Sequence, residues 1–384
     1  MKKNWLKTGA AILFFGCGGV FLFRHYTITR EPSIKSVMES SVEFPKQYKK
    51  KITENLEFDA AIVIAKNVDT KHLYMAKATE QSINREKWAN KLMPQGMKAR
   101  EEEDTDRQLQ SCKEWVYELD DETILRMTSG RVIYMKLPLM GYVFDTFLEG
   151  ASEIGKYYTQ DEDLGFATRM QAEQELKKEL QECGTDIDEL VLRNCYAMDA
   201  KRLEKNDKPT DEEGKLQVDE IKAEWTEEDE GYYYEWTQCF QGLPVYYGAK
   251  VSADGLDEAD MPLQIYQTKN GMQYVYMEGI FSFEKQKEEQ KLASWEKISE
   301  SLQERFSDLK MESRFVVKRC ELYEFPLWVE KQEYQMRPVW ICTVEEQFSD
   351  IESGSSQGSE EGDVQNIYIP IDAQTGEEMF ELEG

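Results

Sequence analysis

Apolar and polar residues alternate along much of this chain, which predicts β-strands that turn one face toward a core. The clearest run is "IYIPID" at 367–372, and its alternating apolar residues are Ile367, Ile369 and Ile371. Asp372 is expected to accept backbone hydrogen bonds in a following turn, and Gly376 to adopt a positive φ there. Pro370 cannot donate a backbone hydrogen bond, so we expect this strand to lie at a sheet edge or to end at the proline.

Two hairpins are predicted where alternating runs flank turn residues. The segment 123–136 alternates on both sides of Ser129-Gly130, and Asn270-Gly271 separates two further alternating runs. A first strand is expected at 58–67. Other strands are predicted at 189–198, 217–225, 232–240, 243–251, 313–323 and 337–346.

Helical spacing of apolar residues occurs in three places. One helix begins at Thr168, which forms a capping-box pair with Gln171, and ends before Gly184. Its apolar stripe consists of Ala172, Leu176, Leu180 and Cys183. A second amphipathic helix is expected at 294–309 and a short one at 83–93. The stripe of the second helix consists of Trp295, Ile298, Leu302 and Phe306.

A helix followed by several antiparallel strands thus occurs twice, which predicts an α+β fold of two repeated units, each with a helix covering a sheet. The charged or polar runs 98–107, 199–215 and 349–363 are expected to be loops. The predicted divisions are a transmembrane anchor or signal at 1–24, a stalk at 25–56, a strand-rich N-terminal domain at 57–160, a first helix-plus-sheet unit at 161–285 and a second helix-plus-sheet unit at 286–384.

The N-terminal segment determines the expected location. Residues 8–23 contain no charge, and residues 5–23 are long enough to cross a membrane if Lys7 extends to the interface. We expect a retained single-pass anchor in the cell membrane, with the body outside the cytoplasm because basic residues are slightly in excess before the span. A cleaved signal peptide and a lipoprotein carrying its lipid on Cys17 are the two alternatives.

The chain is strongly acidic, since 47 Lys and Arg against 75 Asp and Glu give a net charge of −28 at pH 7. Such a surface repels phosphate backbones, so we expect no nucleic-acid partner. Proteins with basic surfaces and divalent cations are electrostatically easier partners. The 40% of hydrophobic residues favours a folded chain over a disordered one.

Four stretches resemble PepSY-type domains. The run "IYIPIDAQTGEEM" resembles their closing hairpin, and "YYYEWTQCFQGLPVYY" resembles their aromatic strand with Gly-x-Pro-Val. The run "CELYEFPLWVEKQEYQMRPVWICTVEE" has a strand, an excursion and Pro-Val-Trp, and the helix from Thr168 precedes its strands in the expected order. Residues 57–384 together resemble an uncharacterised family of membrane-anchored or lipoprotein-type extracytoplasmic proteins of clostridia-like Gram-positive bacteria. The architecture is also similar to YycH/YycI-like regulators of membrane sensor kinases, which implies a regulatory role.

No catalytic, cofactor-binding or metal-binding residue is predicted. The two histidines, His25 and His72, lack the context of a catalytic set, and the acidic run 252–260 lacks EF-hand spacing. The six cysteines beyond the N-terminal segment either form disulfides or remain buried thiols. If one bridge exists, Cys320 and Cys342 are the expected pair, because they fall on adjacent predicted strands.

We therefore expect a non-enzymatic, membrane-anchored extracytoplasmic protein that binds or regulates another cell-envelope protein. No cofactor is expected, and a small-molecule ligand is not specified by any motif. The alternatives are a solute- or cation-binding lipoprotein and an envelope hydrolase whose acid pair has no visible sequence signature.

Overall fold

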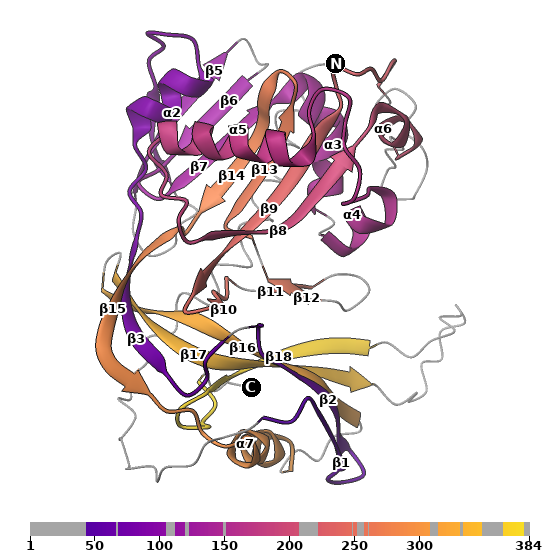
Figure 1. Cartoon of the computed structure of the whole chain (residues 1–384), viewed down its shortest axis with the longest axis vertical. Coiled ribbons are helices and arrows are strands. Elements are labelled where there is room, and N and C mark those ends of the chain that lie inside the picture. Colours follow the sequence, from indigo (N-terminus) through magenta and orange to yellow (C-terminus); the bar gives the residue numbers. More distant parts are fainter. Residues whose placement is uncertain are drawn as a thin grey trace.

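Strands form most of the regular structure in this computed structural model, and they build two large sheets that lie one above the other in Figure 1. Eighteen strands and six helices occur within the described residues. The structure describes residues 44–66, 68–104, 112–119, 123–148, 151–206, 222–247, 249–251, 257–259, 261–307, 314–330, 333–347 and 364–379.

The upper sheet in Figure 1 has nine strands in the order β10-β9-β13-β14-β7-β6-β5-β4, with β8 paired to β9. All its pairings are antiparallel. Its strands are β4 (Arg100–Asp104), β5 (Cys112–Leu119), β6 (Thr123–Met127), β7 (Arg131–Lys136), β8 (Leu190–Met198), β9 (Gly231–Phe240), β10 (Leu243–Pro244), β13 (Leu263–Thr268) and β14 (Gly271–Glu278). The two predicted hairpins, β6–β7 and β13–β14, are confirmed, and Gly271 has the positive φ of a tight turn.

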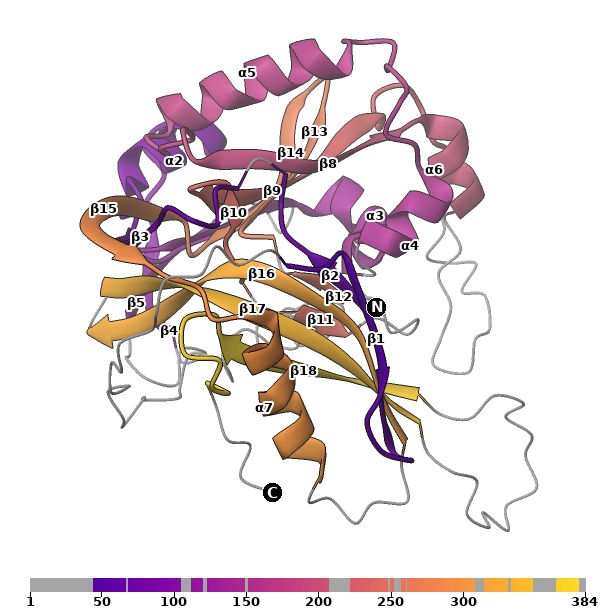
Figure 2. The same ribbon diagram turned by 60° about the horizontal axis from the view of Figure 1, so that its bottom comes forward.

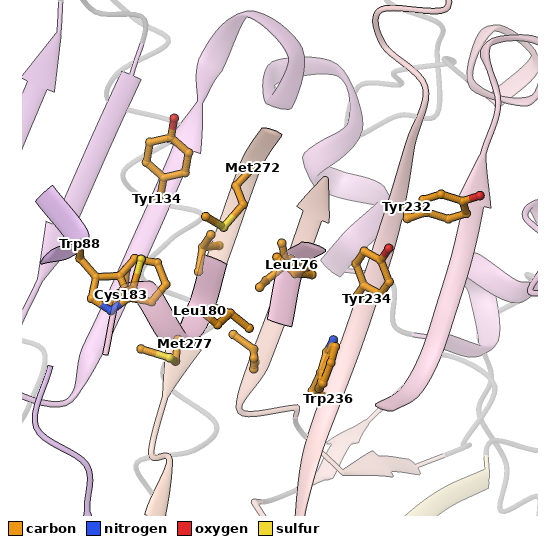
Figure 3. Close-up of a cluster of buried hydrophobic side chains, with 14 of the residues drawn as sticks. Trp88, Tyr134, Leu176, Leu180, Cys183, Tyr232, Tyr234, Trp236, Met272 and Met277 are labelled. Carbon is orange, nitrogen blue, oxygen red and sulfur yellow. The ribbon is translucent and has the colours of Figure 1, made fainter. Parts of the chain in front are cut away.

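Helices cover both faces of this nine-stranded sheet. On one face lie α2 (Arg85–Leu92) and α5 (Arg169–Glu182), whose buried side chains share one core with the sheet. In Figure 3, Trp88 of α2 lies near Cys183 and Met277, and Leu176 of α5 lies near Tyr234 of β9. The capping box of Thr168 and the buried stripe of α5 are both confirmed. On the other face lie α3 (Leu137–Leu148), α4 (Ala151–Tyr157) and α6 (Ala200–Asn206), which pack against Tyr233 and Tyr266.

The lower sheet has seven strands in the order β1-β2-β16-β17-β3-β15, with β18 paired to β17. They are β1 (Gln47–Lys51), β2 (Leu56–Val63), β3 (Leu73–Glu80), β15 (Phe281–Gln290), β16 (Arg314–Glu330), β17 (Glu333–Gln347) and β18 (Val364–Asp372). Helix α7 (Trp295–Ser307) lies along this sheet in Figures 1 and 2, and its predicted apolar stripe is buried. Strands β11 (Ala249–Val251) and β12 (Asp257–Ala259) form a separate pair between the two sheets.

The closing hairpin forms as the alternation predicts. Ile369 and Ile371 are buried, and Ile367 packs against the same core. The Asp372 carboxylate accepts hydrogen bonds from the backbone N–H groups of Gln374 and Thr375 at 2.8 and 2.9 Å, and Gly376 has a φ of 72°.

The predicted fold class is wrong, because the chain does not form two helix-plus-sheet units in succession. Strands β4 to β14 and their helices are an insertion between β3 and β15, which pair with each other in the lower sheet. The lower sheet therefore combines the first three strands with the last four, and β2 pairs in parallel with β16. The boundary predicted at 160/161 lies inside this insertion, and the one at 285/286 lies inside β15. Local periodicity identifies strands but does not specify such distant partners.

Three polar segments have regular structure that their composition did not indicate. Residues 47–51, placed in the stalk, form β1; residues 100–104, placed in a loop, form β4; and residues 200–206, also placed in a loop, form α6. In β4 the side chains also meet the neighbouring strand, since Lys113 of β5 donates a hydrogen bond to the Glu101 carboxylate at 3.2 Å. Partners from elsewhere in the chain thus outweigh local preference.

The predicted anchor at 5–23 lies outside the described residues, as do residues 105–107, 207–215 and 349–363 of the predicted loops. Within the part of the chain that the structure describes, no helix has both the length and the apolar character needed to cross a membrane.

Candidate functional site

The two sheets are joined by residues 238–247, which we call the junction segment. It contains the end of β9, a turn at Gln241-Gly242, β10 and the extended residues 245–247. Gln241 and Gly242 have φ values of 54° and 84°. Two successive positive φ values are typical of a type I′ turn, whose twist matches a two-residue β-hairpin. The turn therefore sends the chain from the nine-stranded sheet back over the seven-stranded one.

Two glutamine side chains of this segment bind backbone groups of the seven-stranded sheet. The Gln238 amide donates to the carbonyl oxygen of Phe281 at 2.8 Å and accepts from its N–H at 2.7 Å. The Gln241 amide binds Tyr74 in the same way, with distances of 2.7 and 2.9 Å. Gln238 is fully buried, and the Tyr247 hydroxyl donates a third hydrogen bond to its Oε1 at 2.6 Å. The Gln238 amide thus forms with Phe281 of β15 the two hydrogen bonds that a neighbouring strand would form, and the Gln241 amide does the same with Tyr74 of β3.

The same segment also pairs with β16. Val245 forms a parallel β-bridge with Glu324, and the Tyr246 N–H donates to the Glu324 carbonyl oxygen at 2.8 Å. On this edge β16 pairs with β2 only as far as Glu321. The junction segment therefore continues the sheet from the point at which β2 ends.

The opposite edge of the hairpin changes partners at the same level. Pro338 of β17 lies directly across from Glu324, and β17 pairs with β3 up to Met336 and with β18 from Val339 onward. At the level of Glu324 and Pro338, therefore, both strands of the β16–β17 hairpin change their outer neighbour. The neighbour of β16 changes from β2 to the junction segment, and that of β17 changes from β3 to β18.

Glu324 is the most unusual titratable residue at this junction. Its side chain is fully buried, and neither carboxyl oxygen has a hydrogen-bond partner. Burial raises the pKa of the carboxyl group from 4.5 to about 8. The group is therefore protonated at neutral pH, and its burial keeps it from contacting a substrate in this conformation. The sequence pattern that could have indicated this residue is its alternation with Leu322 and Pro326 in β16, which puts an acidic side chain on an apolar face.

A second group of buried charges lies in the nine-stranded sheet. The Glu114 carboxylate accepts hydrogen bonds from Arg126 at 2.5 and 3.1 Å and from Arg131 at 3.1 Å. Glu114 and Arg131 are almost completely buried. Both oxygens of this buried carboxyl group are hydrogen-bonded to guanidinium groups, so we assign the cluster a structural role in the sheet.

The cysteines have separate structural roles. Cys320 of β16 and Cys342 of β17 form a disulfide, which confirms the expected pair. Cys183 and Cys195 are buried free thiols, and burial raises the pKa of each to about 12. Thiols with such pKa values are poor nucleophiles at neutral pH, since the thiolate is the reactive form.

Most of the polar groups considered from the sequence do not come together. His72 is exposed and contacts the Glu289 carboxylate at 2.5 Å, while His25 lies outside the described residues. Most of the acidic run 252–260 also lies outside them. Within the described part, no three His, Cys, Asp or Glu side chains are arranged to hold a metal ion.

An apolar surface occurs at the end of the β16–β17 hairpin. The side chains of Trp328 and Val329 are 46% and 56% exposed, although both lie in a long strand. Large exposed aromatic residues are enriched at protein interfaces, because they bury much area with little loss of side-chain entropy. The excursion expected between the two strands is instead the outer end of this hairpin.

Comparisons with known proteins support the fold and do not identify a family. No protein-family model matches the chain, and no curated protein matches it. Among solved structures, it is similar to the crystal structure of an uncharacterized protein from Eubacterium rectale ATCC 33656, with a TM-score of 0.55 and 14% sequence identity. The match covers 88% of this chain and 94% of that chain. At this level of identity the similarity concerns the fold alone.

Proposed function

We propose that this chain is a non-enzymatic, membrane-anchored extracytoplasmic protein that binds or regulates another protein of the cell envelope. The apolar segment 5–23 supplies the anchor, and the folded body lies outside the cytoplasm. The body is acidic, so its partner is expected to present a basic surface.

The observation that carries the proposal is the Cys320–Cys342 disulfide. Both cysteines are completely buried in the core of the seven-stranded sheet, so the bridge belongs to the folded structure rather than to its surface. Structural disulfides persist in oxidising compartments and are rare in the cytosol. The bridge therefore favours a body that folds outside the cytoplasm.

The exposed end of the β16–β17 hairpin is the surface that we assign to the partner. Trp328 and Val329 are consecutive residues at a register shift of the β16–β17 ladder, and an interface would bury their exposed apolar area. Pro326 precedes them and lacks a backbone N–H, which weakens this strand edge as a template for another strand. Side-chain contact rather than strand addition is therefore the expected mode of binding.

The experiment is crosslinking of the tagged full chain in intact membranes, followed by affinity recovery and identification of the attached protein. Wild type is expected to retain one membrane partner, and the double variant Trp328→Ser, Val329→Ser to lose it. Met170→Ser is the matched control, because Met170 is 66% exposed on α5, away from the hairpin. Recovery of the protein alone from wild-type membranes would contradict the proposal, as would equal partner recovery from the double variant.

A further inference from the structure

The carboxyl group of Glu324 lies in apolar surroundings, beside the junction segment that pairs with its strand. Because side chains of a strand alternate between faces, Leu322 and Pro326 of β16 share its face. Across the sheet, Pro338 lies opposite, with Met336 and Trp340 on either side of it. The junction segment contributes Leu243, Val245 and Tyr247 to the same face, since Val245 pairs with Glu324.

The charged and titratable groups near this row are separated from the Glu324 carboxyl group. Arg337 and Asp372 contact each other at 3.5 Å and belong to the opposite face of the sheet. Tyr247 shares the face of Glu324, but its hydroxyl group donates to Gln238. Cys320 and Cys342 also share this face, and they do not titrate because they are bonded to each other. Burial is the sole cause of the shifted pKa, and no charge of the described residues adds to it.

The free energy of burial in such surroundings is much less favourable for a carboxylate than for the uncharged acid. A protonated carboxyl group loses about one or two hydrogen bonds to water on burial, whereas an isolated carboxylate loses far more solvation energy. A carboxylate therefore favours any opening that admits water. The junction segment is the neighbour of Glu324 at the edge of β16, so its departure would open that edge to water. It is held to β16 by the Tyr246–Glu324 hydrogen bond and to β3 and β15 by the two glutamines.

We propose that Glu324 makes the junction segment a proton-controlled latch. The proton on the buried carboxyl group keeps the segment on the seven-stranded sheet, and the segment opens more easily as the medium becomes less acidic. This latch is independent of the identity of any envelope partner. After opening, the chain still joins the two sheets at the β3–α2 and β14–β15 connections, so their relative orientation is restrained by fewer contacts.

The pH range of the effect follows from proton linkage. In the closed state the carboxyl group titrates near pH 8, and in a hydrated open state it titrates near its ordinary pKa of 4.5. Between these two values the open state has released the proton and the closed state has not. The opening equilibrium of the segment therefore increases about tenfold for each pH unit in this window and becomes constant above it.

Hydrogen–deuterium exchange of the full-length protein between pH 5.5 and 9 tests the proposal, with rates corrected for the intrinsic pH dependence of amide exchange. The amides of residues 238–247 in wild type are expected to lose about tenfold in protection per pH unit up to pH 7.5, and to show no further loss above pH 8. Glu324→Gln and Glu324→Met are expected to remove this dependence, because neither side chain ionises. Glu321→Gln is the matched control on the same strand, where Glu321 binds Arg319 at the surface, and it is expected to behave as wild type.

Three results overturn the latch. The first is that protection of residues 238–247 in the wild-type protein does not change between pH 5.5 and 7.5. This test requires no variant. The second is a Glu324→Met protein that keeps the wild-type dependence. The third is protection of residues 238–247 as large as that of α5 at every pH, because segments that open only together exchange through global unfolding rather than local opening. If the glutamine variant fails to fold, the methionine variant still decides, since it replaces the buried polar group with an apolar one of similar length.

Discussion

Cys320 and Cys342 face each other across the two longest strands, with their Cα atoms 4.1 Å apart and their sulfur atoms bonded. A Cα separation this short is typical of a non-hydrogen-bonded pair of an antiparallel ladder. This geometry recurs at every second pair of the ladder, so Glu324 and Pro338, four positions along from the cysteines, also direct their backbone groups away from each other. This is why the Glu324 carbonyl oxygen is available to Tyr246 of the junction segment.

Removal of the disulfide is expected to destabilise the body. The bridge closes a loop with a sequence separation of 22 residues, and a loop of this size contributes about 3 kcal/mol in the chain-entropy model. Urea unfolding of the double variant Cys320→Ala, Cys342→Ala should show this loss relative to wild type. Cys239→Ala is the control, since Cys239 is a free thiol. Equal midpoints for wild type with and without reductant would indicate that the bridge does not form.

Loss of the Gln238 amide is expected to weaken the contact between the sheets. Gln238→Leu keeps a similar volume but leaves the N–H and C=O of Phe281 without their partner. Each buried group that loses its hydrogen bond costs about 1–3 kcal/mol. Chemical denaturation should therefore show a loss of several kcal/mol. The same substitution at Gln365, which is exposed on β18, is expected to have little effect.

Replacement of Glu324 is expected to change how the stability of the protein depends on pH. The folded-state pKa is raised, so the favourable contribution of the protonated group is complete below pH 4.5 and decreases as pH rises to about 8. Within that window wild type should lose at most about 1.4 kcal/mol per pH unit relative to Glu324→Met. Unfolding curves of both proteins at pH 5, 6, 7 and 8 measure this difference. Parallel curves at all four pH values would show that Glu324 is not buried as a neutral acid.

The capping box at the start of α5 gives a prediction that does not involve the junction. The Thr168 hydroxyl accepts a hydrogen bond from the Gln171 N–H, and the Gln171 Oε1 accepts one from the Thr168 N–H. Thr168→Ala should destabilise the protein by about 1 kcal/mol, and Thr168→Ser should restore most of the loss. Thermal unfolding of the three proteins side by side provides the measurement. Similar losses in the serine and alanine variants would attribute the effect to the lost methyl group.

Local sequence patterns by themselves determined the secondary structure wherever one face of an element is buried. The stripes of α5 and α7, the two tight hairpins and the closing strand with its turn at Asp372 all form as predicted. The reason is that periodicity, capping residues and turn residues act over a few positions, and the core then selects the apolar face. The cysteine pair was also predictable, because it required only that two neighbouring strands be adjacent.

The tertiary structure alone decided how these elements are combined. No local signal distinguishes the insertion of β4–β14 between β3 and β15 from two consecutive units, because strand pairing depends on surfaces that meet only in the folded chain. The same applies to β1 and β4, polar strands formed by pairing with a neighbour. The role of Glu324 also depends on this arrangement. Its alternation with Leu322 and Pro326 indicates an apolar face, but it becomes a buried neutral acid only where β17 and the junction segment pack beside it in the folded chain.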